Sequence, residues 1–468
     1  MINKSEIYLN KKISPKKLWN FIEKIQETET EIHSFSFYKS NELMAEIAIA
    51  PYSYAPMQLY SLSKSFTSTA IGIAERMGLV DLEEKIIDIF PEHLPEVIND
   101  NIKNMRVRHV LTMNNGHGGC SMGLVSNSDN PISAFFEKPV EFEPGTHFSY
   151  DTGSTYMLSA IIKKRTGMTT LDFLMINLFE PLGITPDRWY KLGETSEGGI
   201  GLQLSSKDVA KLGLLYLNKG MWNGERILTE KWCEDAGKPH TDNSGNGTPD
   251  WTSGYGYQFW VNSQTGFRGD GAWGQYLMII PEMDIVFSMF SDNRDMQKCI
   301  DIMMDYFRDF EAEGEEFDLA EKLDSLYLPY SSEEKEIKIP EKYYRLKPNG
   351  QKFTLVFPKF NGDTFSLKLS DGERIQTIKA GNGFWIENRI VAASFKPNLQ
   401  SLIKKGRTEE ATFYASYKIV DGKIQLVARF INCVHRKEWT IDFTDGFSLD
   451  YNEVFDMIAE DSKKLTSL

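Results

Sequence analysis

The segment Ser61-Leu62-Ser63-Lys64-Ser65-Phe66 decides how the rest of the chain is interpreted. It begins a long apolar stretch, residues 61–79, whose composition predicts a helix. Residues three apart on a helix share a face, so we expect the Ser61 hydroxyl and the Lys64 amine to meet. Free N–H groups at the helix start suit a developing oxyanion. Burial in an apolar helix would lower the lysine pKa and make the amine a usable base.

The spacing Ser-x-x-Lys alone is weak evidence, because it occurs five times in the chain. Only Ser61 both follows a predicted hairpin and opens an apolar helix. The alternative interpretation makes Ser61 a helix N-cap and lets Lys64 reach solvent. A rival nucleophile is Ser121 in Gly119-Cys120-Ser121-Met122-Gly123, which matches G-x-S-x-G. That motif requires a strand before it and a helix after it, and both flanks look like loops.

Strand-like runs stand at both ends of the first 312 residues. Ser14-Pro15 predicts the start of a helix, with serine as N-cap and proline in its first turn. The middle, about 80–250, is rich in helices, including one capped by Ser205. This order predicts an antiparallel sheet with packed helices and an inserted helical subdomain. The expected strands span 32–39, 43–50, 255–261, 275–280 and 285–290, and a further helix spans 297–310.

The C-terminal part changes character. Residues 313–334 include an acidic run and are predicted to form a linker. From 335 to 468, short strand patterns alternate with hairpin signals, which predicts a separate antiparallel β domain, either a meander sheet or a small barrel. The turn signals are Asn361-Gly362, Asp371-Gly372, Asn382-Gly383 and Asp421-Gly422. This domain is a candidate cover for the cleft or a surface for homo-oligomers, and the sequence leaves both open.

Composition excludes several classes of function. The formal net charge of -14 disfavours nucleic acid as a partner. No apolar run reaches the roughly 18 residues of a membrane span. The first twelve residues have no apolar signal core, so we expect a cytoplasmic protein with four reduced cysteines. Histidine is scarce and shows no metal-ligand spacing, so no metal or other cofactor is expected.

Five ordered motifs resemble the penicillin-recognising serine enzymes, which include class C β-lactamases, D,D-peptidases, family VIII esterases and nylon-oligomer hydrolases. The first motif is the Ser61–Lys64 segment, and the resemblance covers about residues 30–300. The others are Met105 to Met113, Glu143 to Tyr150, Gly199 to Trp232, and Gly271 to Gln275 leading to Pro281.

The resemblance implies an α/β domain with an antiparallel sheet plus an all-helical subdomain, with the site between them. It implies that Ser61 attacks a carbonyl and forms an acyl-enzyme, while Lys64 and Tyr150 relay the proton. The N–H groups of Ser61 and Ala272 would form the oxyanion hole. His147 is the runner-up base, although no acid obviously orients it.

This sequence departs from the enzymes that it resembles at two places that bear on the substrate. Thr152 stands where β-lactamases carry asparagine; its hydroxyl would still bind Lys64, and nylon-oligomer hydrolases have a small hydroxyl residue there. Gly269-Asp270-Gly271 replaces Lys-Thr-Gly or His-x-Gly, so the cation for a substrate carboxylate is missing. We expect Arg268 to point away from Asp270, which would then repel anions or attract cations. Asp270, Gly271, Thr152 and Trp273 are the predicted pocket residues.

The sequence therefore favours a serine hydrolase acting on a small carboxylic ester or linear amide. The first alternative is a β-lactamase or D,D-peptidase of the same fold. The second, of another class, is an inactive acyl-binding or sensor protein that uses the β domain for interaction.

Overall fold

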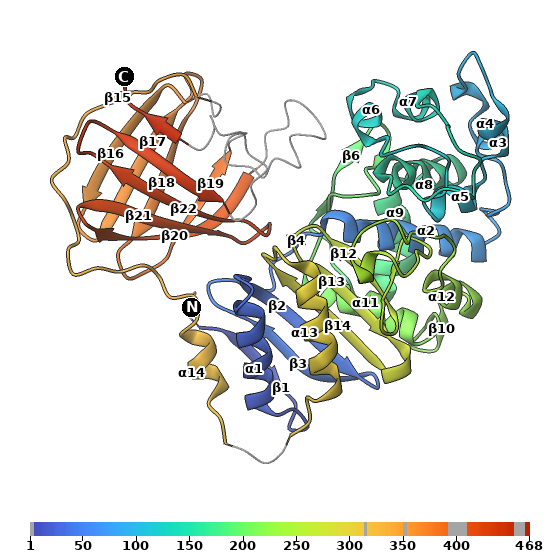
Figure 1. Ribbon diagram of the computed structural model, residues 1–468, viewed down its shortest axis with the longest axis horizontal. Coiled ribbons are helices and arrows are strands. Elements are labelled where there is room, and N and C mark those ends of the chain that lie inside the picture. Colours follow the sequence, from blue (N-terminus) through green and yellow to red (C-terminus); the bar gives the residue numbers. More distant parts are fainter. Residues whose placement is uncertain (1–3, 313–315, 350–352, 392–409, 454–463) are drawn as a thin grey trace. The chain divides into compact units, whose positions relative to one another are not determined.

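The computed structural model describes residues 4–312, 316–349, 353–391, 410–453 and 464–468. They form two compact units (Figure 1). One unit comprises Tyr8–Glu46 and Pro56–Glu315, and the other comprises Met1–Ile7, Ile47–Ala55 and Glu316–Leu468. No helix among the described residues is long and apolar enough to cross a membrane.

A seven-stranded sheet organises the first unit, in the order β1-β3-β2-β14-β13-β12-β11 (Figure 1). β2 and β14 pair antiparallel although they come from opposite ends of the unit, as the sequence predicts. The pairs β13–β14, β12–β13 and β11–β12 are also antiparallel. The strands are β1 (Glu6–Leu9), β2 (Ile32–Lys39), β3 (Glu42–Ala48), β11 (Trp260–Val261), β12 (Phe267–Gly271), β13 (Gln275–Ile280) and β14 (Ile285–Ser291).

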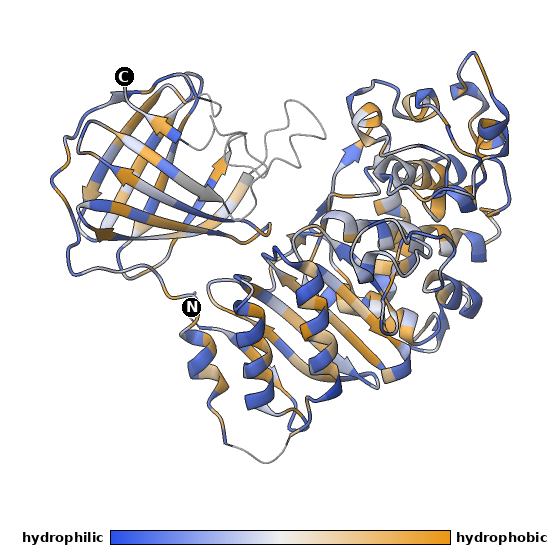
Figure 2. Cartoon of the chain, in the orientation of Figure 1, coloured by the Kyte–Doolittle hydropathy of each residue, from blue (hydrophilic) through white to orange (hydrophobic). Residues whose placement is uncertain are grey.

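Helices cover both faces of this sheet. α1 (Pro15–Gln26) and α13 (Met296–Arg308) lie together on one face, where Phe21 and Phe307 pack on Phe287 of β14. α11 (Ser206–Leu217) packs on β13 and β14 from the other face. Figure 2 shows α1 and α13 alternating between hydrophobic and hydrophilic residues, as expected for helices with one buried side.

The helical subdomain surrounds α2 (Ser63–Arg76), which packs against α8 (Thr152–Thr166). Its other helices are α3 (Ile86–Ile89), α4 (Asp100–Asn104), α5 (Val107–Leu111), α6 (Met122–Asn127), α7 (Pro131–Glu137), α9 (Thr170–Leu174), α10 (Glu180–Leu182) and α12 (Glu230–Ala236). Short strands also occur here: β4 (Met57–Gln58), β5 (Arg188–Trp189), β6 (Lys191–Leu192), β7 (Thr195–Ser196), β8 (Leu202–Leu204), β9 (Met221–Trp222) and β10 (Glu225–Arg226).

The C-terminal part of the second unit is a β-barrel. Its first and last strands are joined by a bridge between Leu346 and Ser467, flanked by a hydrogen bond of 2.9 Å from Lys347 N to Thr466 O. Three of the four predicted turn signals connect strands that pair with each other, and the fourth, Asn382-Gly383, connects two strands that both pair with β20. The strands are β15 (Tyr344–Arg345), β16 (Leu355–Asn361), β17 (Thr364–Ser370), β18 (Ile375–Gly381), β19 (Ile386–Val391), β20 (Glu410–Val420), β21 (Lys423–Phe430), β22 (Arg436–Asp442), β23 (Ser448–Glu453) and β24 (Lys464–Thr466).

Three local predictions need correction. The helix expected at Ser61 begins at Ser63, after a 3₁₀ turn at Tyr60–Leu62. The strand expected over 255–261 is reduced to Trp260–Val261, because Gln258 has a φ of 60° and interrupts the extended run. Helix α14 (Leu319–Asp324), with buried Leu319 and Leu323, lies inside the segment predicted as a linker.

Candidate active site

Ser61 lies in the tight 3₁₀ turn that leads into α2. Strand β12 passes very close to this turn, because two of its residues have no side chain. A Cβ on Gly269 would lie 2.5 Å from Leu62 Cδ1, and one on Gly271 would lie 2.1 Å from the Leu59 carbonyl oxygen. Gly269 and Gly271 therefore bring the end of β12, and Ala272 after it, close to the turn that contains Ser61.

Lys64 sits beneath Ser61 in the first turn of α2. Its Nζ lies 3.1 Å from Ser61 Oγ and donates to the Gly199 carbonyl at 2.9 Å. The side chain is only 1% exposed. Burial lowers the pKa of Lys64 to about 8, although nearby Cys120, Asp151 and Asp270 act to raise it. The predicted pair is thus brought together, with an amine that loses its proton far more easily than an exposed lysine.

Tyr150 completes the cluster from the residue before the N-cap of α8. Its ring centroid lies 4.9 Å from Lys64 Nζ, and its hydroxyl is hydrogen-bonded to Ser61. The ring stacks on Trp260 with centroids 5.2 Å apart and planes at 19°. Burial, followed by the charge of Asp270, raises the pKa of Tyr150 well above its ordinary value. The raised pKa favours the neutral phenol of Tyr150 over its phenolate.

A buried network that the sequence did not reveal anchors Tyr150. The carboxylate of the next residue, Asp151, accepts hydrogen bonds from Ser121 N at 2.7 Å, Ser121 Oγ at 2.8 Å and Gly153 N at 2.9 Å. It also accepts from Asn115 Nδ2 at 2.9 Å and pairs with His117 Nδ1 at 3.0 Å. Burial raises the pKa of Asp151, but these hydrogen bonds outweigh it and hold the pKa below its usual value. The aspartate joins residues 115–121 to the start of α8.

Ser121, the alternative nucleophile, and His147, the alternative base, are engaged in other contacts. Ser121 is fully buried and donates to Asp151, so it is not placed as a nucleophile. The ring of His147, the runner-up base, stacks on Phe142 with centroids 3.8 Å apart. Cys120, by contrast, is exposed and close enough to act electrostatically on both Lys64 and Tyr150.

The prediction for Arg268 and Asp270 is wrong. Residues two apart on a strand point to the same face, and Arg268 Nε donates to Asp270 Oδ2 at 3.0 Å. Trp260, which pairs with Arg268 across β11 and β12, is also hydrogen-bonded to Asp270. Asp270 is therefore not the unpaired acid that the sequence led us to expect.

The other predicted pocket residues lie in two places. Trp273 follows Ala272 in the turn after β12, with a φ of 68°, and packs edge-on against Tyr60 at 5.0 Å. Thr152 does not form the expected bond to Lys64 in the described part of the chain. Its methyl group instead faces Gly199, where a Cβ would lie 2.6 Å away.

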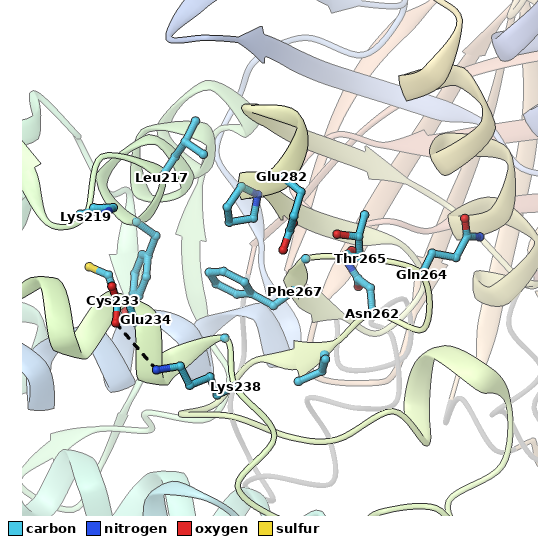
Figure 3. A pocket seen from close by; sticks show the side chains of 15 residues that line it. Leu217, Lys219, Cys233, Glu234, Lys238, Asn262, Gln264, Thr265, Phe267 and Glu282 are labelled. Atoms are coloured by element: carbon cyan, nitrogen blue, oxygen red, sulfur yellow. Dashed lines mark hydrogen bonds and ion pairs between the residues drawn. The ribbon is translucent and has the colours of Figure 1, made fainter.

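None of these residues lines the pocket drawn in Figure 3, which measures about 490 Å³ and includes Phe267, Val261 and Leu217. No group of three or more potential metal ligands occurs among the described residues.

The chain belongs to the β-lactamase family, whose sequence model matches residues 55–298. This confirms the resemblance and the predicted fold class. A curated relative, the 6-aminohexanoate-dimer hydrolase of Paenarthrobacter ureafaciens, is 24% identical over 298 residues, covering 58% of this chain and 74% of its own. Penicillin-binding protein 4* of Bacillus subtilis is 27% identical over 28% of this chain and 30% of its own.

Solved structures agree on the fold. A family VIII carboxylesterase superposes with a TM-score of 0.52 at 15% identity, over 65% of this chain and 99% of its own. The octameric penicillin-binding protein homologue of Pyrococcus abyssi gives 0.51 at 18% identity, over 88% of this chain and 97% of its own. The relatives include hydrolases of esters and amides, so the chain is a member of a family of hydrolases.

Proposed function

We propose that this protein is a serine hydrolase that forms an acyl-enzyme on Ser61 and cleaves a small carboxylic ester or linear amide. The observation that carries the proposal is the 3.1 Å contact between Lys64 Nζ and Ser61 Oγ. That amine has a pKa of about 8, so a useful fraction is unprotonated near neutral pH.

In the first step, neutral Lys64 accepts the Ser61 proton as Oγ attacks the substrate carbonyl. The bond between carbonyl carbon and Oγ forms, and the negative charge moves onto the carbonyl oxygen. The N–H groups of Ser61 and Ala272 stabilise that oxyanion. The close approach of β12 to the 3₁₀ turn that contains Ser61 supports this assignment.

Tyr150 then acts as the acid. A neutral phenol beside both Ser61 and Lys64 donates its proton to the leaving oxygen or nitrogen and is reprotonated by the lysinium. Water attacks the acyl-enzyme by the reverse route and releases the acid. This division of work follows from the opposite directions of the two pKa shifts, downward for Lys64 and upward for Tyr150.

One alternative function keeps a specific observation. Penicillin-binding protein 4* among the relatives favours β-lactam or D,D-peptide chemistry, but Gly269-Asp270-Gly271 offers no unpaired cation for the carboxylate of such substrates. A structural relative that matches 88% of this chain is described as octameric, so self-association of this chain stays a proposal. The inactive acyl-binding or sensor protein is disfavoured by the close Ser61–Lys64 contact. Cytoplasmic location and the absence of nucleic-acid and membrane partners stay predictions.

The test is a panel on one purified sample. We expect turnover of p-nitrophenyl acetate and butyrate, little turnover of nitrocefin, and labelling by a fluorophosphonate. Ser61→Ala abolishes turnover and labelling, whereas Ser121→Ala, the control for the rival motif, keeps the label. Strong nitrocefin hydrolysis would favour a β-lactamase, and absence of both turnover and labelling would favour the binding protein.

A further inference from the structure

The end of β12 contains a buried ion pair that the proposed chemistry does not use. The side chain of Arg268 is fully buried. Its Nε donates to Asp270 Oδ2 at 3.0 Å, and its Nη1 donates to Asn262 Oδ1 at 3.0 Å. The guanidinium carbon lies 4.4 Å from the centroid of the Trp251 ring. Three groups thus hold one cation in a fixed orientation.

The guanidinium has unused donor capacity. Its second terminal nitrogen, Nη2, is buried and has no hydrogen-bond partner among the described residues. The remaining nearby acid, Asp250, is 3.8 Å from Nη1, beyond hydrogen-bond distance. Buried polar groups are nearly always paired, so a buried arginine with a spare N–H is unusual. Guanidinium groups bind carboxylates through two parallel N–H donors, and here Asp270 takes only one.

Asp270 links this ion pair to the surroundings of the reacting groups. It is 8% exposed, whereas Arg268 is not exposed at all. It is hydrogen-bonded to Trp260, on which Tyr150 stacks. Its charge also reaches both proton-handling residues, because after burial it contributes most to raising the pKa of Tyr150 and it acts against the lowering of the Lys64 pKa.

We propose that Arg268 and Asp270 form a masked carboxylate subsite, in which Asp270 occupies the face of the guanidinium that a substrate carboxylate would otherwise take. The chain supplies its own anion to its own cation beside Ser61. The site consequently selects uncharged substrates and discriminates against those with a carboxylate near the reacting carbonyl. This inference rests on the proposed ester or amide hydrolysis and narrows its substrate class.

The test compares two esters that differ only in charge: p-nitrophenyl hexanoate and the p-nitrophenyl monoester of adipic acid, which carries a carboxylate in place of the terminal methyl. Asp270→Asn removes the charge and keeps the shape. Asp270→Ser removes the charge and opens a path to Arg268. The double variant Asp270→Ser/Arg268→Met then removes the cation with a side chain of similar volume. Thermal melting identifies any variant that fails to fold, and the ratio of the two kcat/KM values cancels general losses of activity.

We expect the natural chain to prefer the hexanoate ester at least tenfold. Asp270→Asn should lower the ratio of kcat/KM for the hexanoate ester to kcat/KM for the adipate ester. Asp270→Ser should lower this ratio further, by tenfold or more. The double variant should restore the preference for the hexanoate ester. Equal turnover of both esters by the natural chain, or an unchanged ratio in Asp270→Ser, overturns the inference and leaves the proposed hydrolase intact.

Failure of the proposed function has a different signature, namely no turnover of either ester. Binding then gives the readout, through the fluorescence of the neighbouring Trp251 and Trp260. We expect phenylacetamide to bind the natural chain more tightly than phenylacetate, and Asp270→Ser to reverse that order. An unchanged order in Asp270→Ser overturns the inference.

Discussion

Acidification is expected to lower the reactivity of the Ser61 hydroxyl in proportion to the fraction of Lys64 that is protonated. The buried amine has a pKa of about 8 in place of 10.5, a difference that corresponds to about 3 kcal/mol favouring the neutral form. Only the neutral amine accepts the serine proton. The reactive fraction is therefore about one half at pH 8, about a tenth at pH 7 and about a hundredth at pH 6.

The rate of Ser61 modification by a fluorophosphonate measures this directly, because it requires no knowledge of the substrate. Measured from pH 6 to pH 9.5, the rate should rise about tenfold per pH unit at the acidic end and level off above pH 8. Lys64→Met is the control, since it keeps most of the buried volume and removes the titrating group. Its rate should be low and nearly independent of pH.

Three results would refute the reasoning. A midpoint near 6.5 would point to a histidine as the base, and a midpoint near 10.5 would show a lysine that water reaches freely. A pH profile that persists unchanged in Lys64→Met would likewise assign the base to another residue.

Three further perturbations test the surroundings of this pair. Tyr150→Phe keeps the stack on Trp260 and should lower ester kcat/KM by about 10²–10⁴-fold with little change in Tm; an unaffected rate excludes the phenol as the acid. A bulky maleimide on exposed Cys120 should block turnover in the natural chain but not in Cys120→Ser, and a fully labelled, fully active protein would place the thiol away from the site. Asp151→Ala leaves several buried donors without an acceptor and should cost about 3–5 kcal/mol in urea unfolding, whereas a loss below 1 kcal/mol would show that water replaces the carboxylate.

Features that depend on neighbouring residues could be predicted from the sequence. Ser14 caps α1 by accepting from Lys17 N, because the serine–proline signal acts within one turn. The approach of Ser61 and Lys64 is also local, since residues three apart lie on one face where the 3₁₀ turn continues into α2. For β2 and β14, the strand patterns at both ends of the unit predict that the two strands belong to one sheet. They do not predict that these two strands are neighbours in it.

Features that depend on contacts between residues distant in the sequence could not be predicted. The run 255–261 has the composition of a strand, but Gln258 leaves the extended conformation, where its side chain donates to Leu111 O at 2.6 Å and accepts from Thr155 at 2.7 Å. The Asp151 network joins residues thirty apart in the sequence, with only the position of Asp151 before a buried helix as a signal. The Arg268–Asp270 pair is different, because the two-residue period of a strand would have predicted it.

Position 152 is a further case in which a contact distant in the sequence decides how a predicted site residue is placed. Neutral Lys64 has two N–H groups and one lone pair, and it acts as a base only when the lone pair points at Ser61 Oγ. The bond to the Gly199 carbonyl fixes one N–H and so orients the amine. A glycine at 199 permits the close packing against Thr152, because a Cβ there would lie 2.6 Å from the Thr152 methyl group. We therefore expect Thr152 to act on Lys64 through the shape of residues 198–199, a role that the longer asparagine side chain would not fill in the same space.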